Sequence, residues 1–256
     1  MNWEVDVFGS IRNRVKAEKE NFAASKEEYN AAMVSLCAQV ASSYINMREL
    51  QQEVKVAQQN CRSQQTVVQI TQKRYETGLV SKLDVAQAQS VYYSTKASLP
   101  MLEAGIIQYA NSLAILLGLY PSDLQKIMET DASLPEYIEP VGVGLPANLL
   151  LRRPDVRAAE RQGNALASVQ EVDNAMSSYK NSIKQIVALR EVVNQGKQTL
   201  DLSLDLYKQG LTPFQNVLDA QRSLLTYQNQ LTQAQGSSLL NLIQLYQSLG
   251  GGWNPM

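Results

Sequence analysis

The chain has 256 residues, of which 45% are apolar but only 7% aromatic, and its 23 basic and 24 acidic side chains leave a formal net charge of −1. It contains no histidine, which excludes Ser-His-Asp triads, other histidine-based acid–base catalysis and histidine-containing metal sites. The balanced charge argues against nucleic acid and anionic membrane surfaces as partners. We therefore expect no enzyme, no cofactor and no metal site.

An internal repeat organises the chain. The segment from Tyr75 to Gln89 aligns with the segment from Tyr207 to Gln221 at an offset of 132 residues and without gaps. The same offset pairs Gly118 with Gly250. A register held over this length indicates a tandem duplication.

Each repeat is predicted to form a long helical hairpin. Apolar residues recur at steps of three and four from Val40 to Cys61 and again from Val172 to Val193, which is typical of helices that pack along a coiled-coil seam. Residues 10–77 are long enough for one helix on the order of 100 Å, which must lie against other helices. The pattern predicts an all-α fold of tandem-duplicated antiparallel hairpins.

Glycines mark the turn of each hairpin. Gly78 and Gly210 are placed to end a helix in the left-handed conformation. Directly afterwards, Ser81–Asp84 and Thr212–Gln215 resemble capping boxes, and Pro213 suits the first position of a helix. We expect each repeat to be helix, tight turn, helix, with both turns pointing the same way.

The middle of the chain changes character. Four prolines within residues 119–153 interrupt any long helix, so this part is predicted to be an irregular connector. A new helix is predicted to begin at Pro154, where Asp155 in the first turn is favoured by the helix dipole. The predicted domains are a first hairpin repeat over 1–118, the connector over 119–153 and a second repeat over 154–256.

Three motifs carry a resemblance to a known family. They are Leu-Leu-Arg-Arg-Pro-Asp-Val-Arg-Ala-Ala-Glu over 150–160, Trp-Glu-Val-Asp-Val-Phe-Gly over 3–9, and Leu-Gly-Gly-Gly-Trp over 249–253. Together with the duplication, they resemble the TolC-like outer-membrane factors, in the NodT/CusC-type lipoprotein branch. The resemblance implies an efflux duct of the outer membrane, with this portion in the periplasm.

The resemblance also implies partners and missing parts. Family members form homotrimers that dock onto a periplasmic adaptor protein and are driven by an inner-membrane pump of the resistance-nodulation-division class. Their β-barrel is made of four strands per subunit, and we find none of these strands in the chain. The sequence passes through Gly163-Asn164 to a returning helix, so we infer an engineered helical fragment whose barrel strands are replaced by that turn and which does not span the membrane. A natural deletion is the alternative.

The resemblance assigns two groups of site residues. The adaptor-docking tips are Gly78, Leu79, Val80 and Ser81 in the first repeat and Gly210, Leu211, Thr212 and Pro213 in the second. The pore gate comprises Asp84, Tyr207, Asn216 and Asp219.

These assignments have structural alternatives. The glycines and hydroxyl residues of the tips also serve simply to turn the chain, although exposed leucines there have no folding rationale. Asp84 also fits the third position after a capping Ser81. Asn216 stands where an aspartate is usual in the family, and Thr212 stands where some members carry a gate-linking arginine.

Two functions remain in competition at this point. The principal hypothesis is a passive transport duct without catalysis. The alternative is a helical coiled-coil scaffold that transports nothing, against which the duplication and the Arg-Arg-Pro-Asp segment argue. The exported solute, whether a drug, a metal ion or another compound, stays open.

Overall fold

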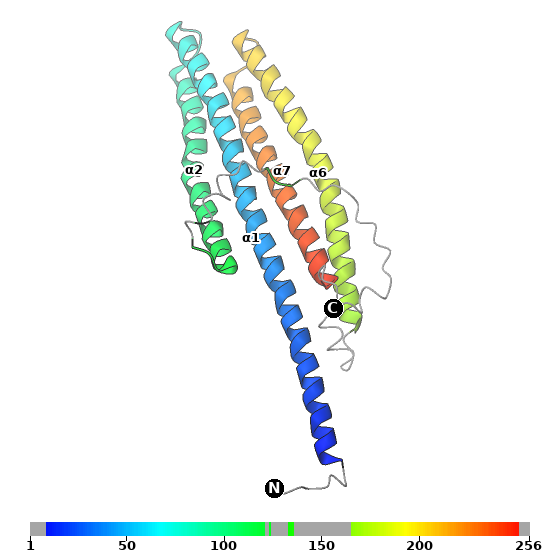
Figure 1. Ribbon diagram of the computed structural model, residues 1–256. Coiled ribbons are helices and arrows are strands. Elements are labelled where there is room, and N and C mark those ends of the chain that lie inside the picture. The colour runs from blue at the N-terminus through cyan, green and yellow to red at the C-terminus, as the bar shows by residue number, and fades with distance from the viewer. Residues whose placement is uncertain (1–8, 121–122, 124–132, 136–164, 251–256) are drawn as a thin grey trace. The chain divides into compact units, whose positions relative to one another are not determined.

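The computed structural model describes residues 9–120, 123, 133–135 and 165–250. Within these residues the chain forms four long helices (Figure 1): α1 (Ser10–Glu76), α2 (Lys82–Leu117), α6 (Ala165–Lys208) and α7 (Phe214–Ser248). The predicted all-α fold of two long hairpins is confirmed, and α1 ends one residue before the predicted position. Most of the predicted connector, the start at Pro154 and the Gly163-Asn164 junction lie outside the described residues.

The chain divides into two compact units, and each unit contains segments of both repeats. Unit 1 comprises residues 1–39, 141–177 and 242–256, and unit 2 comprises residues 40–140 and 178–241. In the described part of unit 1, Val172 and Leu245 are buried, whereas Ile11 and Phe22 on α1 are exposed. The predicted domain boundaries after residues 118 and 153 stay a prediction.

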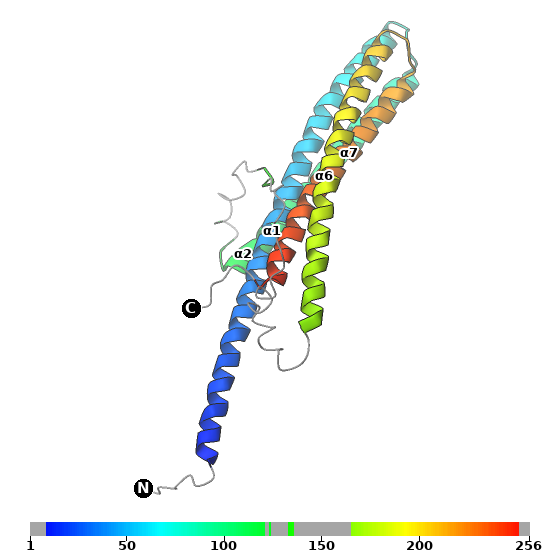
Figure 2. The same ribbon diagram turned by 90° about the vertical axis from the view of Figure 1, so that its right-hand side faces the viewer.

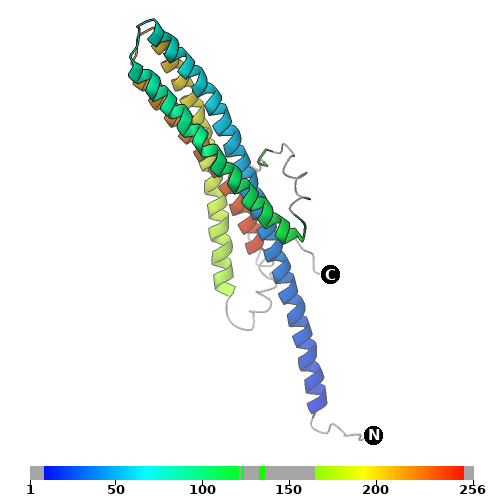
Figure 3. The ribbon, with the colours of Figure 1, turned by 90° about the vertical axis from the view of Figure 1, so that its left-hand side faces the viewer.

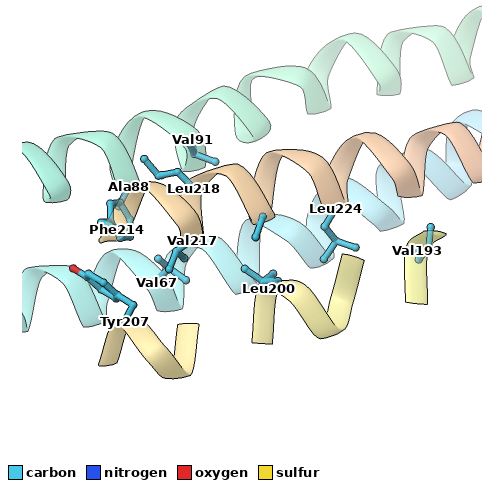
Figure 4. Packing of buried hydrophobic residues seen from close by; sticks show 11 residues of the cluster. Val67, Ala88, Val91, Val193, Leu200, Tyr207, Phe214, Val217, Leu218 and Leu224 are labelled. Atoms are coloured by element: carbon cyan, nitrogen blue, oxygen red, sulfur yellow. The ribbon is translucent and has the colours of Figure 1, made fainter. Parts of the chain in front are cut away.

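Unit 2 contains both turns and the largest hydrophobic cluster. Its parts of α1, α2, α6 and α7 run side by side, with both turns at the same end (Figures 1 and 2). All four helices contribute to the cluster in Figure 4, which consists of Val67, Ala88, Val91, Val193, Leu200, Tyr207, Phe214, Val217, Leu218, Ala220 and Leu224. The two hairpins therefore share one core.

Helix α1 packs on two faces, which the predicted single seam did not anticipate. One face meets α2, where Met47 packs against Ile106 and Ala110 (Figure 3 shows α2 from this side). The approach is close, because a Cβ added at Gly105 would come within 2.8 Å of Leu50 Cδ1. Leu50 itself, like the other predicted seam residues Val54 and Cys61, is only half-buried.

The second face of α1 has a strict coiled-coil spacing but a polar composition. Its buried residues alternate at steps of four and three: Glu53, Ala57, Asn60, Gln64, Val67 and Thr71. The predicted seam consisted of apolar residues, so it did not include the four polar members of this set, Glu53, Asn60, Gln64 and Thr71.

Helix α7 is unusually poor in charge. From Ser223 to Ser248 it contains no Asp, Glu, Lys or Arg. It is nevertheless not a membrane span: among the described residues, no helix is both long and apolar enough to cross a bilayer.

Candidate functional site

The two turns share one backbone design. Gly78 and Gly210 adopt positive φ angles of 73° and 75°, as predicted, which side-chain-bearing residues rarely adopt. In the first turn, the Gly78 N–H donates to the Tyr75 carbonyl and the Leu79 N–H to the Arg74 carbonyl, both at 2.9 Å. These two bonds form a Schellman motif, which satisfies carbonyls at the end of α1.

The second turn repeats this pattern. The Gly210 N–H donates to the Tyr207 carbonyl at 3.0 Å, and the Leu211 N–H donates to the Leu206 carbonyl at 2.9 Å. Both motifs leave the following leucine in solvent, with Leu79 65% and Leu211 69% exposed. Each hairpin thus presents one apolar side chain at its end.

The start of α2 differs from the predicted capping box. Ser81 is the N-cap, with extended backbone, but its side chain makes no capping bond to the backbone. Its Oγ instead donates to Asp84 Oδ1 at 3.2 Å, while the Asp84 N–H donates to the Ser81 carbonyl. The Asp84 carboxylate accepts this hydrogen bond from the serine hydroxyl. The first turn of α2 is therefore closed by the half-buried side chain of Asp84.

The start of α7 uses different side chains. The helix begins at Phe214, so Pro213 precedes it and does not occupy its first position. Asn216 Nδ2 donates to Thr212 Oγ1 at 2.5 Å across the turn, and Gln215 Nε2 donates to Asp219 Oδ1 at 2.9 Å. Asn216 and Asp219 are exposed, whereas Thr212 is half-buried.

Tyr207 lies at the centre of this end of unit 2. It is only 2% exposed, and its ring centroid is 5.1 Å from that of Phe214 (Figure 4). The hydroxyl lies close to Thr71 and Asp84 but makes no hydrogen bond of good geometry. Burial raises the pKa of the Tyr207 phenol, and the negative charge of Asp84 raises it further. The phenol is therefore a neutral group inside the core.

Arg74 joins the two hairpins and was not among the predicted site residues. Its Nη1 donates to the Lys208 carbonyl at 2.6 Å, across 134 residues of sequence. Its guanidinium carbon stands 4.9 Å from the centroid of the Tyr207 ring, which is the geometry of a cation–π contact. One local signal was available: in the repeat register Arg74 aligns with Leu206, an exchange of an apolar residue for a cation.

The arrangement is suited to contact rather than to chemistry. Leu79 and Leu211 form an exposed apolar surface, and Asp84 closes the first turn of α2. Arg74, which we call the arginine strap, holds the two hairpins together. Among the described residues, no group of three or more His, Cys, Asp and Glu side chains could hold a metal ion.

Comparison with known proteins decides the family. The family model for "outer membrane efflux protein" matches residues 1–119 and 151–251, which is most of the chain. The chain belongs to the outer membrane efflux protein family. The efflux function and the outer-membrane assignment predicted from the motifs are thereby confirmed, and the scaffold alternative has no support.

Curated members of the outer membrane efflux protein family align over nearly the whole chain. The toluene efflux pump outer membrane protein TtgC of Pseudomonas putida is 24% identical over 330 residues, covering 98% of this chain and 68% of its own. The cation efflux system protein CusC of Escherichia coli is 25% identical, covering 98% and 71%. Because the aligned stretch is longer than the 256 residues of this chain, these relatives contain internal segments without a counterpart here.

A solved family structure supports the fold directly. The outer-membrane channel OprN superposes with a TM-score of 0.90 at 25% identity, covering 99% of this chain and 74% of its own. The long hairpins described above are therefore those of an outer-membrane channel.

Proposed function

We propose that the chain forms the periplasmic duct of an outer-membrane efflux channel and has no catalytic activity of its own. Its two turns dock onto a periplasmic adaptor protein, which couples the duct to an inner-membrane pump of the resistance-nodulation-division class. The native channel is a homotrimer. Family membership and the efflux-pump names of the relatives support this proposal.

The pair of matched turns carries the docking proposal. Both turns lie at one end of unit 2 and expose Leu79 and Leu211 in the same position of the same motif. The residue after the glycine of a Schellman motif often packs on the last turn of the helix, but Leu79 and Leu211 remain 65% and 69% exposed, so most of each side chain is open to a partner. Two such leucines, next to Val80 and Thr212, form the apolar contact that a protein partner would cover.

A variant pair tests the docking proposal. Changing Leu79 and Leu211 to Ser is expected to weaken binding of the cognate adaptor severalfold, measured by biolayer interferometry, and to leave the thermal stability unchanged. Leu119→Ser is the matched control, because Leu119 also follows a left-handed glycine in the same motif but closes the other end of α2. Equal binding by the Leu79/Leu211 variant and the control would contradict docking through the tips.

The same end of unit 2 supports the gate proposal. Asp84 and Asp219 place two carboxylates beside the turns, and Asn216 adds a polar group. Tyr207 fastens the hairpins together under Arg74. Carboxylates at a constriction favour cations by Coulomb attraction, so these residues suit a narrow pore end.

Conductance tests the gate proposal. In a full-length channel in a planar bilayer, Asp84→Ala and Asp219→Ala are expected to raise conductance, because side-chain contacts that hold the closed end together are lost. Ser81→Ala separates the two roles of Asp84, since it removes the bond from Ser81 Oγ but keeps the carboxylate. Unchanged conductance in both aspartate variants would contradict the gate.

A further inference from the structure

The contact between α1 and α7 is a polar seam. Asn60 Nδ2 donates to Gln228 Oε1 at 2.6 Å, and Gln233 Nε2 donates to Glu53 Oε1 at 3.0 Å. Farther along α1, Glu49 reaches Gly236. Residue numbers rise on α1 as they fall on α7, so these are successive contacts of one antiparallel seam between the two repeats.

The Glu49 carboxyl group fits a notch that exists because residue 236 is glycine. A Cβ added at Gly236 would overlap Glu49 Oε2 and come within 2.6 Å of its carboxyl carbon. Gly236 itself is buried in α7. A glycine costs a helix interior about 1 kcal/mol relative to alanine, and here it makes room for the glutamate of a neighbouring helix.

The charges around the notch disfavour an ionised Glu49. Glu53 lies one turn away on the same face of α1, and α7 brings no charged residue from Ser223 to Ser248. Burial raises the pKa of Glu49 to about 7, and the negative charge of Glu53 contributes to the rise. On the flanking helices, Glu103 of α2 and Lys180 and Lys184 of α6 are exposed, and Arg190 of α6 is half-buried.

Arg48, the neighbouring cation on α1, is engaged elsewhere. Its guanidinium lies 5.0 Å from the centroid of the Tyr44 ring, and its Nη1 donates to Gln51 Oε1 at 2.8 Å. Both of these contacts are with side chains of α1 itself.

We propose that the Glu49–Gly236 notch is a proton-controlled joint between the two hairpins: a protonated Glu49 seats in the notch and tightens the α1–α7 seam, and ionisation expels it. This property goes beyond export. It is measured on the chain alone, so its failure would leave the transport proposal untouched.

The direction of the pH response follows from the sign of the shift. The pKa of Glu49 is 4.5 in a free side chain and about 7 in the folded joint. Folding therefore favours the protonated form, and the stabilisation from the joint is complete below about pH 4.5. It is lost as the pH rises through about 7, so the seam is tight in mild acid and loose in mild alkali.

Carbon-13 NMR and hydrogen exchange test the joint on the intact chain. The Glu49 carboxyl resonance is expected to titrate near pH 7. Amide protection in residues 45–53 and 232–240 is expected to fall between pH 6 and pH 8 by on the order of tenfold, which corresponds to one unit of pKa difference. In Glu49→Gln, which keeps the shape but cannot ionise, protection is expected to be equal at both pH values.

Two further variants separate the notch from a general effect of charge. Glu53→Gln is expected to lower the titration midpoint of Glu49, because it removes the neighbouring negative charge. Gly236→Ala is expected to expel the carboxyl group into solvent and return its pKa towards 4.5. Glu103→Gln, an exposed carboxyl change on α2, is the control that leaves the response unchanged.

Three outcomes would overturn the proposal. They are titration of Glu49 near pH 4.5 in the unmodified chain, the same fall in protection in Glu49→Gln, and an unchanged midpoint in Gly236→Ala. Melting temperatures of each variant at pH 6 show that the variant is folded when these measurements are made.

Discussion

The two hairpin ends have the same backbone and opposite side-chain environments. Tyr75 and Tyr207 occupy equivalent positions one turn before their glycines, yet Tyr75 is 41% exposed and Tyr207 is 2% exposed. Seven residues later, at the start of the second helix of each hairpin, Lys82 is exposed while its equivalent Phe214 is buried. The duplication therefore preserved the turn and diverged in what surrounds it.

This difference assigns separate roles to the ends. The second hairpin supplies the aromatic pair Tyr207 and Phe214 to the shared core, and the first hairpin supplies Arg74, which lies over the Tyr207 ring. The backbone motif depends only on a few local residues, so it survives divergence. The packing depends on residues from both hairpins, so each copy was free to specialise.

The largest expected effect distinguishes the two tyrosines. Tyr207→Ala is expected to reduce the free energy of unfolding by about 3 kcal/mol or more, because it leaves a cavity in the core. Tyr75→Ala is expected to cost about 1 kcal/mol or less, because Tyr75 is 41% exposed and lies outside the core cluster. Urea unfolding followed by circular dichroism measures both. Equal costs would mean that the two ends are not packed differently.

Removal of the arginine strap is expected to have the next largest effect. Arg74→Ala should cost about 1–2 kcal/mol, through loss of the cation–π contact and of the bond to the Lys208 carbonyl. Arg74→Lys should recover only part of this, because an ammonium lacks the planar face of a guanidinium. Lys73→Ala, an exposed neighbour, is the control in the same unfolding assay. If Arg74→Ala were as stable as this control, Arg74 would contribute nothing to holding the hairpins together.

The glycine turns should respond alike at both ends. Gly78→Ala and Gly210→Ala are each expected to cost about 1 kcal/mol, because both positions need a positive φ. Space is not the cause: a Cβ meets nothing within 4 Å at Gly78 and only Arg74 Nη2 at 3.8 Å at Gly210. Thermal unfolding of the two variants checks this equality. If only one of the two variants lost stability, the two turns would not depend on the same backbone conformation.

The smallest effect is expected from a substitution that makes the second turn resemble the first. Thr212 is equivalent to Val80, so Thr212→Val removes the acceptor for Asn216 Nδ2 and copies the first hairpin. The exposed bond should be worth about 0.5 kcal/mol. Native-state hydrogen exchange of residues 211–217 detects the change. The same substitution at Thr226, which is exposed and far from the turn, should leave those residues unaffected.

The sequence predicted the features that depend on local residues. The long helices followed from apolar spacing, and the turns followed from Gly78 and Gly210, which the positive φ angles confirm. The predicted capping box at Ser81 was wrong, because the serine hydroxyl donates to the Asp84 side chain and makes no capping bond to the backbone. Whether the hydroxyl donates to a carboxylate or accepts from a backbone N–H is decided by a side-chain rotation that sequence spacing does not specify.

The contacts between hairpins could not be predicted in this way. The strap joins Arg74 to Lys208, and the notch joins Glu49 to Gly236, so each pair depends on how the two repeats are aligned in space. A search for apolar periodicity also passes over buried Glu53, Asn60 and Gln64. The register of the duplication located the tips because it compares one copy with the other, and it says nothing of how the copies meet.

The charge-free stretch of α7 has a consequence for ionic strength. Since Ser223–Ser248 carries no charge, there is no ion pair between this stretch and α1 for added salt to weaken, and salt instead screens the repulsion between Glu49 and Glu53. At physiological salt the screening length is about 8 Å, so the repulsion of Glu49 by Glu53, one helical turn away, is damped only in part. Added salt should therefore shift the titration midpoint of Glu49 slightly towards lower pH without weakening the attraction between the helices.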